Sequence, residues 1–371
     1  MQNIQHLARI PTGISYLLHR EHVWGQPVFF TIETINSCNF RCIYCPQSDP
    51  DHHFVNGRGI MSLDNFKRII ANLQSVFDLR IVSLHRDGEP LLNKHLEDYI
   101  RHLTDLGTCV TVSSNCSLIP EQRAKRLLAS GLRMVTTDFC AQAELYEQLR
   151  ARGIWRETLA GMRNLLQAAA EAKADFRLVI KDIATDGHPR EQAEPIMEET
   201  RKLFVHEKDR VTVIPVYFHN ALGESLVSIQ AASTDSTVPP TMATAAGANG
   251  GAAARNGSPI PATPSPKVEP SGFYSLCHQP WVNFTVDFAG RVVGCCRDLR
   301  SEYIVGNLLE ESAADIWNGE RMKRLRRALA EKQPQEINIC HVCDVPWQGS
   351  YSGQTPLEKI RNFFFSKTWK R

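Results

Sequence analysis

The sequence lacks any long uninterrupted run of apolar residues. In the first thirty residues, where an export signal would lie, Arg9, His19, Arg20 and Glu21 interrupt the apolar stretch. No other segment is long and apolar enough to cross a bilayer. We therefore expect a cytoplasmic protein that does not insert into a membrane.

An excess of charge of one sign is also missing. The 371 residues carry 42 Lys and Arg against 40 Asp and Glu, which gives a formal net charge of +2. A chain so close to neutral has no general attraction for nucleic acid. The basic run 321–332 is interpreted as a solvated helix face, and no nucleic-acid partner is expected.

Cysteine, by contrast, is plentiful, with 11 residues. A cytoplasmic chain keeps its thiols reduced, so we do not expect disulfides. Clustered cysteines in such a protein more often bind metal or carry out redox chemistry. Three of them, Cys38, Cys42 and Cys45, fall in one short segment after a strand-like run.

Strand-like and helix-like segments alternate from residue 28 to residue 218. Apolar, β-branched segments predict strands, and the amphipathic segments between them predict helices. The predicted strands are 28–35, 79–84, 109–114, 132–138, 176–181 and 211–218, and the predicted helices are 62–77, 93–106, 120–130, 143–151, 155–172 and 189–204. About six β/α units predict an α/β fold, a parallel sheet curled into a partial (β/α)6 TIM-like barrel. Functional loops of such folds follow the carboxyl ends of the strands, where Cys38 lies.

Changes in composition divide the chain into five parts. A stretch rich in Ala, Gly, Ser, Thr and Pro cannot bury enough apolar surface to fold, so it predicts a flexible linker. A small cysteine-rich α+β module follows, and we expect the aromatic, basic tail to pack on the barrel rather than on a partner or a membrane. The expected parts are an extension at 1–27, the barrel at 28–225, the linker at 226–270, the module at 271–347 and the tail at 348–371.

Three closely spaced thiols suit an iron–sulfur cube. Cys38, Cys42 and Cys45 could bind three irons of a 4Fe–4S cluster and leave the fourth iron open to a substrate or cofactor. The alternatives are a three-thiolate zinc site completed by a distant histidine, and three thiols without a function. The position at the head of a β/α series favours the cluster.

The motif Cys38-x3-Cys42-x2-Cys45, with Tyr44 before the last cysteine, resembles that of the radical S-adenosylmethionine (SAM) enzymes. In that family a 4Fe–4S cluster binds the amino and carboxylate groups of SAM at its open iron. One-electron reduction then splits SAM into methionine and a 5′-deoxyadenosyl radical. The resemblance implies a partial β/α barrel, which fits residues 28–218, and a reductant of the flavodoxin or ferredoxin type.

The same resemblance implies residues that contact SAM. The family motif Gly-Gly-Glu-Pro is matched by Gly88, Glu89 and Pro90, with Asp87 in place of the first glycine, and is expected to hold the methionine amino group. The other implied cofactor-binding residues are Tyr44, Ser114 and Asn115 after the third strand, and Asp138 and Arg150 near the ribose or carboxylate. The segment 218–224 resembles the family segment after the sixth strand.

A second resemblance lies in the C-terminal module. Cys277-x12-Gly290-x4-Cys295, followed by Cys340-x2-Cys343, resembles the SPASM or twitch type of auxiliary cluster domain. It implies four thiolates around a second 4Fe–4S cluster, and a four-cysteine zinc site is the alternative. No cysteine follows Cys343, so one auxiliary cluster is expected. The neighbouring Cys296 could replace Cys295 as the ligand.

The two resemblances together imply an enzyme that abstracts a hydrogen atom from a small polar substrate. An auxiliary cluster can accept the electron left when the substrate radical loses a proton, which favours oxidation of a sugar or aminocyclitol alcohol. The first alternative is an epimerase, in which Cys116 or Cys296 returns a hydrogen atom. A peptide-modifying enzyme is a further alternative, which the short segment before the first strand makes less expected. A non-catalytic zinc or electron-transfer protein is the last.

Cys116 and four polar residues near strand ends could also face a substrate. Cys116 stands where the family usually has glycine. The polar residues are His85, Arg86, Asp87 and Lys181. Each could orient a substrate or take a proton, and a solvated salt bridge explains them equally well.

Overall fold

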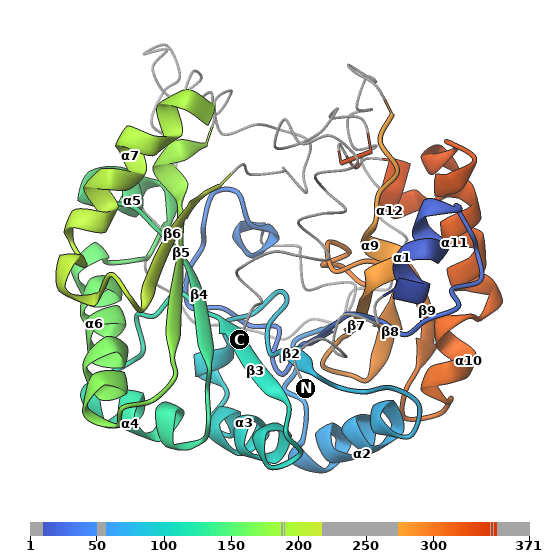
Figure 1. Ribbon diagram of the computed structural model, residues 1–371, viewed down its shortest axis with the longest axis horizontal. Coiled ribbons are helices and arrows are strands. Elements are labelled where there is room, and N and C mark those ends of the chain that lie inside the picture. The colour runs from blue at the N-terminus through green and yellow to red at the C-terminus, as the bar shows by residue number, and fades with distance from the viewer. Residues whose placement is uncertain are drawn as a thin grey trace, which may run out of the picture.

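One sheet of nine strands organises the structure, in the order β6-β5-β4-β3-β2-β1-β7-β8-β9 (Figure 1). The computed structural model describes residues 10–49, 57–186, 188, 190–216, 274–341, 343 and 345–346. The predicted linker, the segment 218–224 and the tail 348–371 lie outside these residues. Within the described part, no helix is both long and apolar enough to cross a membrane.

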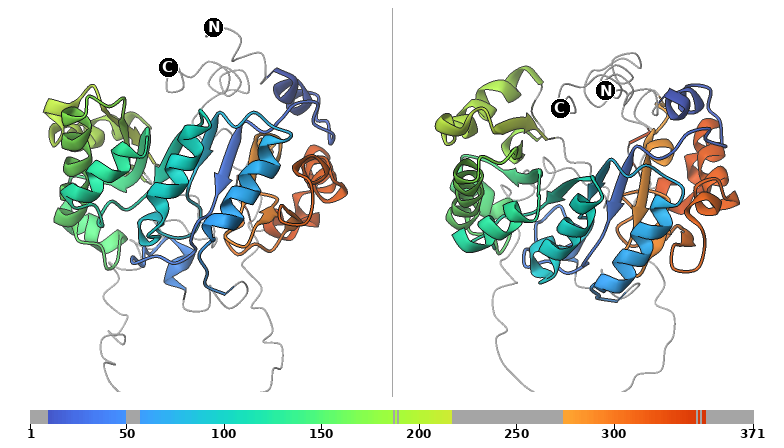
Figure 2. Two further views of the ribbon diagram at one scale, coloured as in Figure 1. Left: turned by 90° about the horizontal axis from the view of Figure 1, so that it is seen from below. Right: turned by 60° about the horizontal axis from the view of Figure 1, so that its bottom comes forward.

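Six parallel strands form the first part of the sheet, and in the described residues one or two helices follow each of the first five. The strands are β1 (Phe29–Ile32), β2 (Ile81–Ser83), β3 (Cys109–Ser113), β4 (Met134–Phe139), β5 (Arg177–Asp182) and β6 (Val211–Pro215). The helices are α2 (Leu63–Gln74), α3 (Leu96–Asp105), α4 (Glu121–Ala129), α5 (Ala143–Leu149), α6 (Trp155–Glu171) and α7 (Arg190–Lys202). The predicted partial barrel is therefore confirmed. Figure 2 shows the green α6–α7 region and the orange C-terminal strands at opposite ends of the curved sheet.

The strands separate an apolar outer layer from a polar inner face. Ile32, Val82 and Ile180 are fully buried against the helices. Because side chains alternate along a strand, the other face of the sheet carries polar groups. Two of these, Ser83 and Thr111, are joined by a hydrogen bond of 2.9 Å between their hydroxyl oxygens. A polar interior suits the binding of a polar molecule.

Helix α2 illustrates how local sequence fixes an element. The Ser62 side chain accepts a hydrogen bond from the Asn65 N–H at 3.1 Å, which caps the helix. Phe66, Ile69 and Leu73 follow at helical spacing and are fully buried. Burial of each such side chain stabilises the fold by about 2 kcal/mol.

The C-terminal module adds three strands to the same sheet. Its elements are α9 (Gln279–Val282), β7 (Asn283–Val286), β8 (Arg291–Val293), β9 (Ile304–Asn307), α10 (Ala313–Trp317), α11 (Glu320–Ala330) and α12 (Asn338–His341). β7 and β8 pair antiparallel and form a hairpin around residues 289–290. β7 also pairs in parallel with β1, which gives β1 a neighbour on both sides. Nothing in the sequence predicts this continuation of the barrel sheet.

The N-terminal segment binds to the C-terminal module. Helix α1 (Ile10–Leu17) places the Tyr16 hydroxyl on the Leu276 carbonyl at 2.8 Å. Farther along, the Trp281 indole N–H donates to the Arg20 carbonyl at 2.8 Å. Figures 1 and 2 both show α1, in dark blue, beside the orange and red helices. Residues from the two ends of the described chain thus form one unit.

The basic run 321–332 begins in α11, and the prediction of a wholly solvated face is wrong for one residue. Arg326 is fully buried and donates to the carbonyls of Pro280 and Glu21, both at 3.0 Å. Its guanidinium lies 4.3 Å from the centre of the Trp317 ring. Burial lowers the pKa of Arg326 to about 9. The sequence of this run contains several cations close together and does not reveal which of them the tertiary structure buries.

Candidate functional site

The loop of Cys38, Cys42 and Cys45 follows β1 and is fixed by backbone hydrogen bonds. The N–H groups of Arg41 and Ile43 donate to the carbonyls of 151 and 149, at 2.8 and 3.0 Å. These carbonyls belong to the end of α5 and the residues after it. The loop is therefore attached to the wall of the barrel on both sides of Cys42.

Burial raises the pKa of all three thiols of this loop. The pKa of Cys38 rises to about 12, and those of Cys42 and Cys45 also lie above the ordinary value. The neighbouring thiols add to the effect, since ionisation of one disfavours ionisation of the next. The thiols are thus protonated in the free protein, and binding of a metal cluster would release their protons. In the described chain, no three Cys, His, Asp or Glu side chains lie close enough together to hold one metal ion.

Gly88 packs directly against the backbone that leads into Cys38. A Cβ atom on Gly88 would lie 2.3 Å from the Ile35 carbonyl oxygen and 2.7 Å from that of Ser37. The next residue, Glu89, donates its N–H to the Ser37 carbonyl at 2.8 Å. Only glycine permits this close approach of the two strand ends.

Glu89 is a buried carboxylate surrounded by donors from two segments. Its oxygens accept from the Leu91 N–H at 3.0 Å, the Ser114 hydroxyl at 2.8 Å and the Asn115 N–H at 2.7 Å. Burial raises the pKa of Glu89, and these hydrogen bonds lower it in part. The structure thus brings together Gly88, Glu89, Ser114 and Asn115, as the sequence predicts.

Asn39 joins the cysteine loop to the end of β3, and the sequence analysis missed it. The Asn115 side-chain amide donates to the Asn39 side-chain oxygen at 2.8 Å. The Asn39 amide in turn donates to the Ser117 hydroxyl at 3.1 Å. The position of Asn39 directly after Cys38 is the sequence feature that could have identified it.

Tyr44, Asp138 and Arg150 form one cluster, in which Arg150 is buried and the other two side chains are half-buried. Arg150 donates to the Tyr44 hydroxyl and to an Asp138 oxygen, both at 2.9 Å. The Lys181 ammonium lies 3.6 Å from the other Asp138 oxygen. Burial raises the pKa of Asp138, but Lys181 and Arg150 outweigh it and hold the pKa below its usual value. The cluster therefore keeps an ionised carboxylate beside the cysteine loop.

His85 lies on the polar face of the sheet near these charges. Its Nδ1 is 2.7 Å from the Ser83 hydroxyl oxygen. Burial, and then the Lys181 cation, lower the pKa of His85 to about 4. The imidazole is therefore neutral at pH 7 and able to accept a proton.

Arg86 connects the barrel to the C-terminal module. Its guanidinium pairs with Glu33 at 2.9 Å, and both side chains are almost fully buried. The same guanidinium donates to the Ser301 hydroxyl at 2.8 Å and to the Asp298 carbonyl. Arg86 was named from the sequence, but Glu33 was missed. The sequence feature that indicates Glu33 is a carboxylate at the end of an apolar strand. Arg86 thus joins the end of β2 to the end of β1 by a buried ion pair, and to the loop that follows Cys295 and Cys296 by hydrogen bonds.

The four predicted thiols of the C-terminal module come from three segments. Cys277 precedes α9, Cys295 follows β8, and Cys340 lies in α12 shortly before Cys343. Burial, and then Cys295, Cys277 and Cys343, raise the pKa of Cys340. Three elements far apart in the sequence thus place these thiols within electrostatic reach of one another.

Cys296 also has side-chain partners outside this group. Its thiol donates to the Gln279 side-chain oxygen at 3.6 Å and accepts from the Asn283 amide at 3.8 Å. A hydrogen bond between the adjacent thiols raises the pKa of Cys295 and lowers that of Cys296. The geometry therefore favours Cys295 as the member of the thiol group.

Cys116 is fully buried at the end of β3. Its φ of 60° lies in the left-handed region, where glycine is the unstrained residue. Its thiol contacts the Ser114 carbonyl oxygen at 3.7 Å, and burial raises its pKa to about 12. The backbone conformation accounts for the family's preference for glycine at this position.

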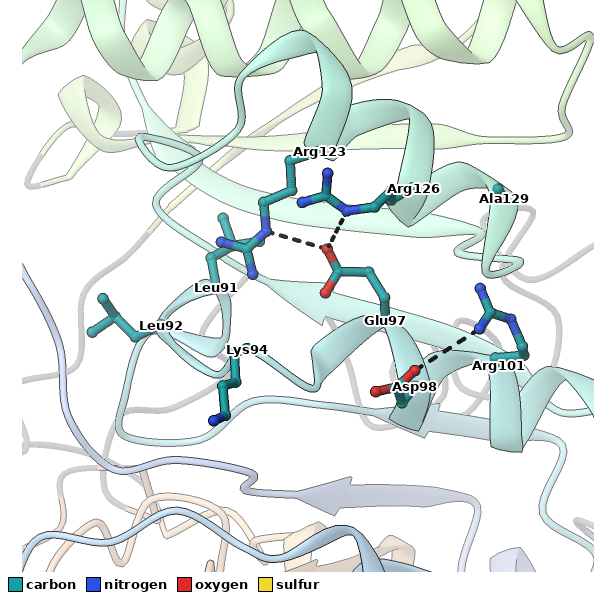
Figure 3. Close-up of a pocket in the computed structure, with 9 residues that line it drawn as sticks. All are labelled: Leu91, Leu92, Lys94, Glu97, Asp98, Arg101, Arg123, Arg126 and Ala129. Carbon is teal, nitrogen blue, oxygen red and sulfur yellow. Dashed lines mark hydrogen bonds and ion pairs between the residues drawn. The ribbon is translucent and has the colours of Figure 1, made fainter.

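A surface cavity of about 590 Å³ lies between α3 and α4, away from these residues. Figure 3 shows Arg123 and Arg126 converging on Glu97, while Arg101 faces Asp98. The charged groups of the cavity thus largely satisfy one another. None of the predicted cofactor-binding residues lines it.

Two family models match the chain. The radical SAM superfamily matches residues 32–183, and the SPASM iron-sulfur cluster-binding domain matches residues 277–344. Together they cover more than half of the chain. The chain belongs to the radical SAM superfamily and carries a C-terminal SPASM domain, and the cofactors of these domains are 4Fe–4S clusters and SAM. Three thiols on one loop, buried or half-buried, and four half-buried thiols in the module are a donor set that fits such clusters.

Curated relatives share part of the chain. GTP 3',8-cyclase of Xanthomonas axonopodis pv. citri is 29% identical over 185 residues, which are 48% of this chain and 53% of the relative. PqqA peptide cyclase of Rhodopseudomonas palustris is 27% identical over 117 residues, 31% of this chain and 29% of the relative. The chain thus matches about half or less of the length of these relatives.

Solved structures share the fold over most of the chain. BtrN in complex with AdoMet and 2-DOIA has a TM-score of 0.51 at 16% identity, covering 86% of this chain and 93% of that one. Streptococcus suis SuiB bound to precursor peptide SuiA has a TM-score of 0.55 at 14% identity, covering 85% and 70%. At these identities the similarity is one of fold.

Proposed function

We propose that this radical SAM enzyme oxidises an alcohol group of a small polar substrate such as a sugar or an aminocyclitol. Three thiols of the barrel would hold the SAM-binding 4Fe–4S cluster, and four thiols of the module would hold one auxiliary 4Fe–4S cluster. The first set is Cys38, Cys42 and Cys45, and the second is Cys277, Cys295, Cys340 and Cys343. When bound, the cofactors supply the radical chemistry that removes a hydrogen atom from carbon.

The remaining site residues would bind and orient. Gly88, Glu89, Ser114 and Asn115 would hold the methionine part of SAM, in line with their shared hydrogen-bond network. Tyr44, Asp138 and Arg150 would contact its ribose or carboxylate. His85, neutral at pH 7, has the protonation state needed to take a proton from the substrate.

The contact made by Arg86 is the observation that carries the proposal. Oxidation by a hydrogen-atom abstraction leaves one electron on the substrate after a proton departs, and that electron needs an acceptor. Arg86 lies two residues before Gly88 and touches Asp298 and Ser301, just after Cys295. An electron acceptor bound at Cys295 would therefore lie close to the strand ends of the barrel, where the substrate would bind, rather than far from them.

The share of each solved structure that aligns with this chain supports a small molecule as the substrate. The chain aligns with 93% of BtrN, whose structure contains 2-DOIA, and with 70% of SuiB, whose structure contains a precursor peptide. A small molecule is therefore the first class of substrate to test, and a peptide is the second. A cytoplasmic location and a flavodoxin or ferredoxin reductant stay predictions.

Anaerobic reconstitution followed by product analysis tests the proposal. We expect about eight irons per chain, formation of 5′-deoxyadenosine, and, with a panel of sugars and aminocyclitols, a product about two mass units lighter than its substrate. A product of unchanged mass that takes up solvent deuterium at carbon would replace oxidation by epimerisation. In that case Cys296→Ala and Cys116→Ala identify the hydrogen-atom donor.

A further inference from the structure

The exposed side of α11 is basic in its first half. Arg321, Arg324 and Arg327 are exposed and Lys323 is half-buried, while Glu320 is the one carboxylate of the helix. We call these four cations the α11 basic face. Figure 1 places α11 on the outer side of the C-terminal module, with α12 and α10 beside it.

Most of this charge is not neutralised locally. Arg327 pairs with Glu21 at 2.5 Å and lies 3.5 Å from Glu320. In the described residues, Arg321, Lys323 and Arg324 form no ion pair, although Arg321 donates to the Ile304 carbonyl at 2.8 Å. A chain of net charge +2 thus concentrates positive charge on one short surface.

The buried side of α11 touches the loop that carries Cys295. Gly294 immediately precedes that cysteine, and a Cβ atom on it would lie 2.8 Å from Leu325 of α11 and 2.8 Å from the Tyr303 ring. The missing side chain lets the helix pack directly on the loop. The α11 basic face is therefore one helix diameter away from Cys295.

Two tyrosines fill the space between α11 and the thiols of the module. The Tyr303 hydroxyl donates to the Arg321 carbonyl at 3.0 Å, and the Tyr274 hydroxyl donates to the Leu329 carbonyl. Both phenols are within electrostatic reach of Cys340. The two tyrosines thus lie between α11 and the thiol group.

We propose that the α11 basic face docks an acidic electron-carrier protein of the flavodoxin or ferredoxin class, which exchanges electrons with the auxiliary cluster. The inference rests on the proposed function, in which each turnover leaves one electron on that cluster. The reduced cluster passes this electron to the oxidised carrier and returns to its resting state, so the carrier is reduced by one electron. Opposite charges would steer the encounter and orient the carrier over α11.

The test uses the Cys38→Ala/Cys42→Ala/Cys45→Ala protein, which is expected to keep only the auxiliary cluster. Its affinity for oxidised flavodoxin is measured by calorimetry, and after reduction with dithionite its electron transfer to flavodoxin is followed by stopped-flow absorbance. In this background Arg321→Glu/Arg324→Glu should weaken binding and slow transfer at least about tenfold at low salt. The difference should shrink at about 0.5 M salt, where charges are screened beyond a few ångströms.

A matched pair of charge reversals serves as the control. Lys94→Glu/Arg101→Glu changes the charge equally at the cavity of Figure 3 and should leave both measurements within about twofold. Oxidation by a small neutral quinone should be equal in all variants, since it needs no docking.

Three results would overturn the inference. They are unchanged flavodoxin binding in the α11 variant, an equal loss in the control variant, and tight binding of an RNA oligonucleotide that depends on the same arginines while flavodoxin is unaffected. If the triple cysteine variant contains no iron, the auxiliary cluster is absent and the proposed function is wrong. Iron analysis shows this before any carrier is added.

Discussion

The barrel gathers its three thiols from a single segment, whereas the C-terminal module gathers four from three separate segments. Cys38, Cys42 and Cys45 share one loop, and backbone hydrogen bonds to the end of α5 hold it in place. The thiols of the module are brought together by α9, the end of β8 and α12. The barrel site is therefore determined mainly by local geometry, and the module site by packing.

The two regions also differ in what supports them. Around the cysteine loop, glycine and carboxylate groups of neighbouring strand ends meet backbone atoms at close range. Around the module thiols, side chains such as Tyr303 and Leu325 fill the space, and the N-terminal segment covers them from outside. Backbone contacts tolerate little change, while side-chain contacts can adjust.

Removing the thiols of either region should produce the largest effects. Cys38→Ala/Cys42→Ala/Cys45→Ala should abolish formation of 5′-deoxyadenosine, a loss above about 100-fold, while about half of the iron remains. Cys277→Ala/Cys340→Ala/Cys343→Ala should also lose about half of the iron yet still cleave SAM. Iron analysis and chromatography of 5′-deoxyadenosine check both, and cleavage by the first variant would refute the assignment of the SAM cluster.

Adding one methyl group in each region gives a sharper comparison. Gly88→Ala would drive a Cβ into two carbonyl oxygens and should lower 5′-deoxyadenosine formation at least about tenfold. Gly294→Ala meets the side chains of Leu325 and Tyr303, which can move, so its effect on auxiliary iron should be less than about twofold. Equal losses in the two variants would contradict the distinction drawn between backbone and side-chain support.

Breaking the link between the regions should cost stability. Arg86→Met leaves the buried Glu33 carboxylate without its cation and should lower the free energy of unfolding by about 3–5 kcal/mol, as measured by urea denaturation. The double variant Arg86→Met/Glu33→Leu removes both charges and should recover much of that loss. If the double variant is as unstable as the single one, the ion pair is not the source of the loss.

Glu33 should also make stability depend on pH. Burial raises its pKa to about 7, although the Arg86 cation opposes the shift. The folded protein thus binds a proton that the unfolded chain releases near its ordinary pKa, so the contribution is full below about pH 4.5 and disappears as pH rises through 7. The free energy of unfolding should fall by about 3 kcal/mol from this group between those values, and Glu33→Gln should flatten the profile.

The smallest effect is expected at a surface pair of the barrel that lies away from both groups of thiols. Lys125 lies 2.6 Å from Glu121, one turn away on α4, and both side chains are largely exposed. Lys125→Ala should change the free energy of unfolding by less than about 0.5 kcal/mol. A larger change would mean that the surface of the barrel contributes more to the free energy of unfolding than an exposed ion pair is expected to contribute.

Much of the barrel and its site could be predicted from the sequence. The alternation of β-branched and amphipathic segments predicted all six strands and their helices, because the period of apolar residues is a local property. The resemblance to the radical SAM enzymes implied Glu89, Ser114 and Asn115 as cofactor-binding residues, and the structure joins them by hydrogen bonds. Glu33 and Asn39 were missed because a single polar residue beside a strand has no periodic pattern.

The sequence by itself determined the thiol loop, the β/α order and the strand ends where the polar side chains meet, since each depends on spacing within a short segment. Only the tertiary structure decided that β7 extends the barrel sheet, that Arg326 is enclosed over Trp317, and that the N-terminal segment covers the module. The strand pairing, the N-terminal cover and the Arg326–Glu21 hydrogen bond join residues that are hundreds of positions apart. Their partners are selected by shape and by buried hydrogen bonds, and no local pattern encodes either.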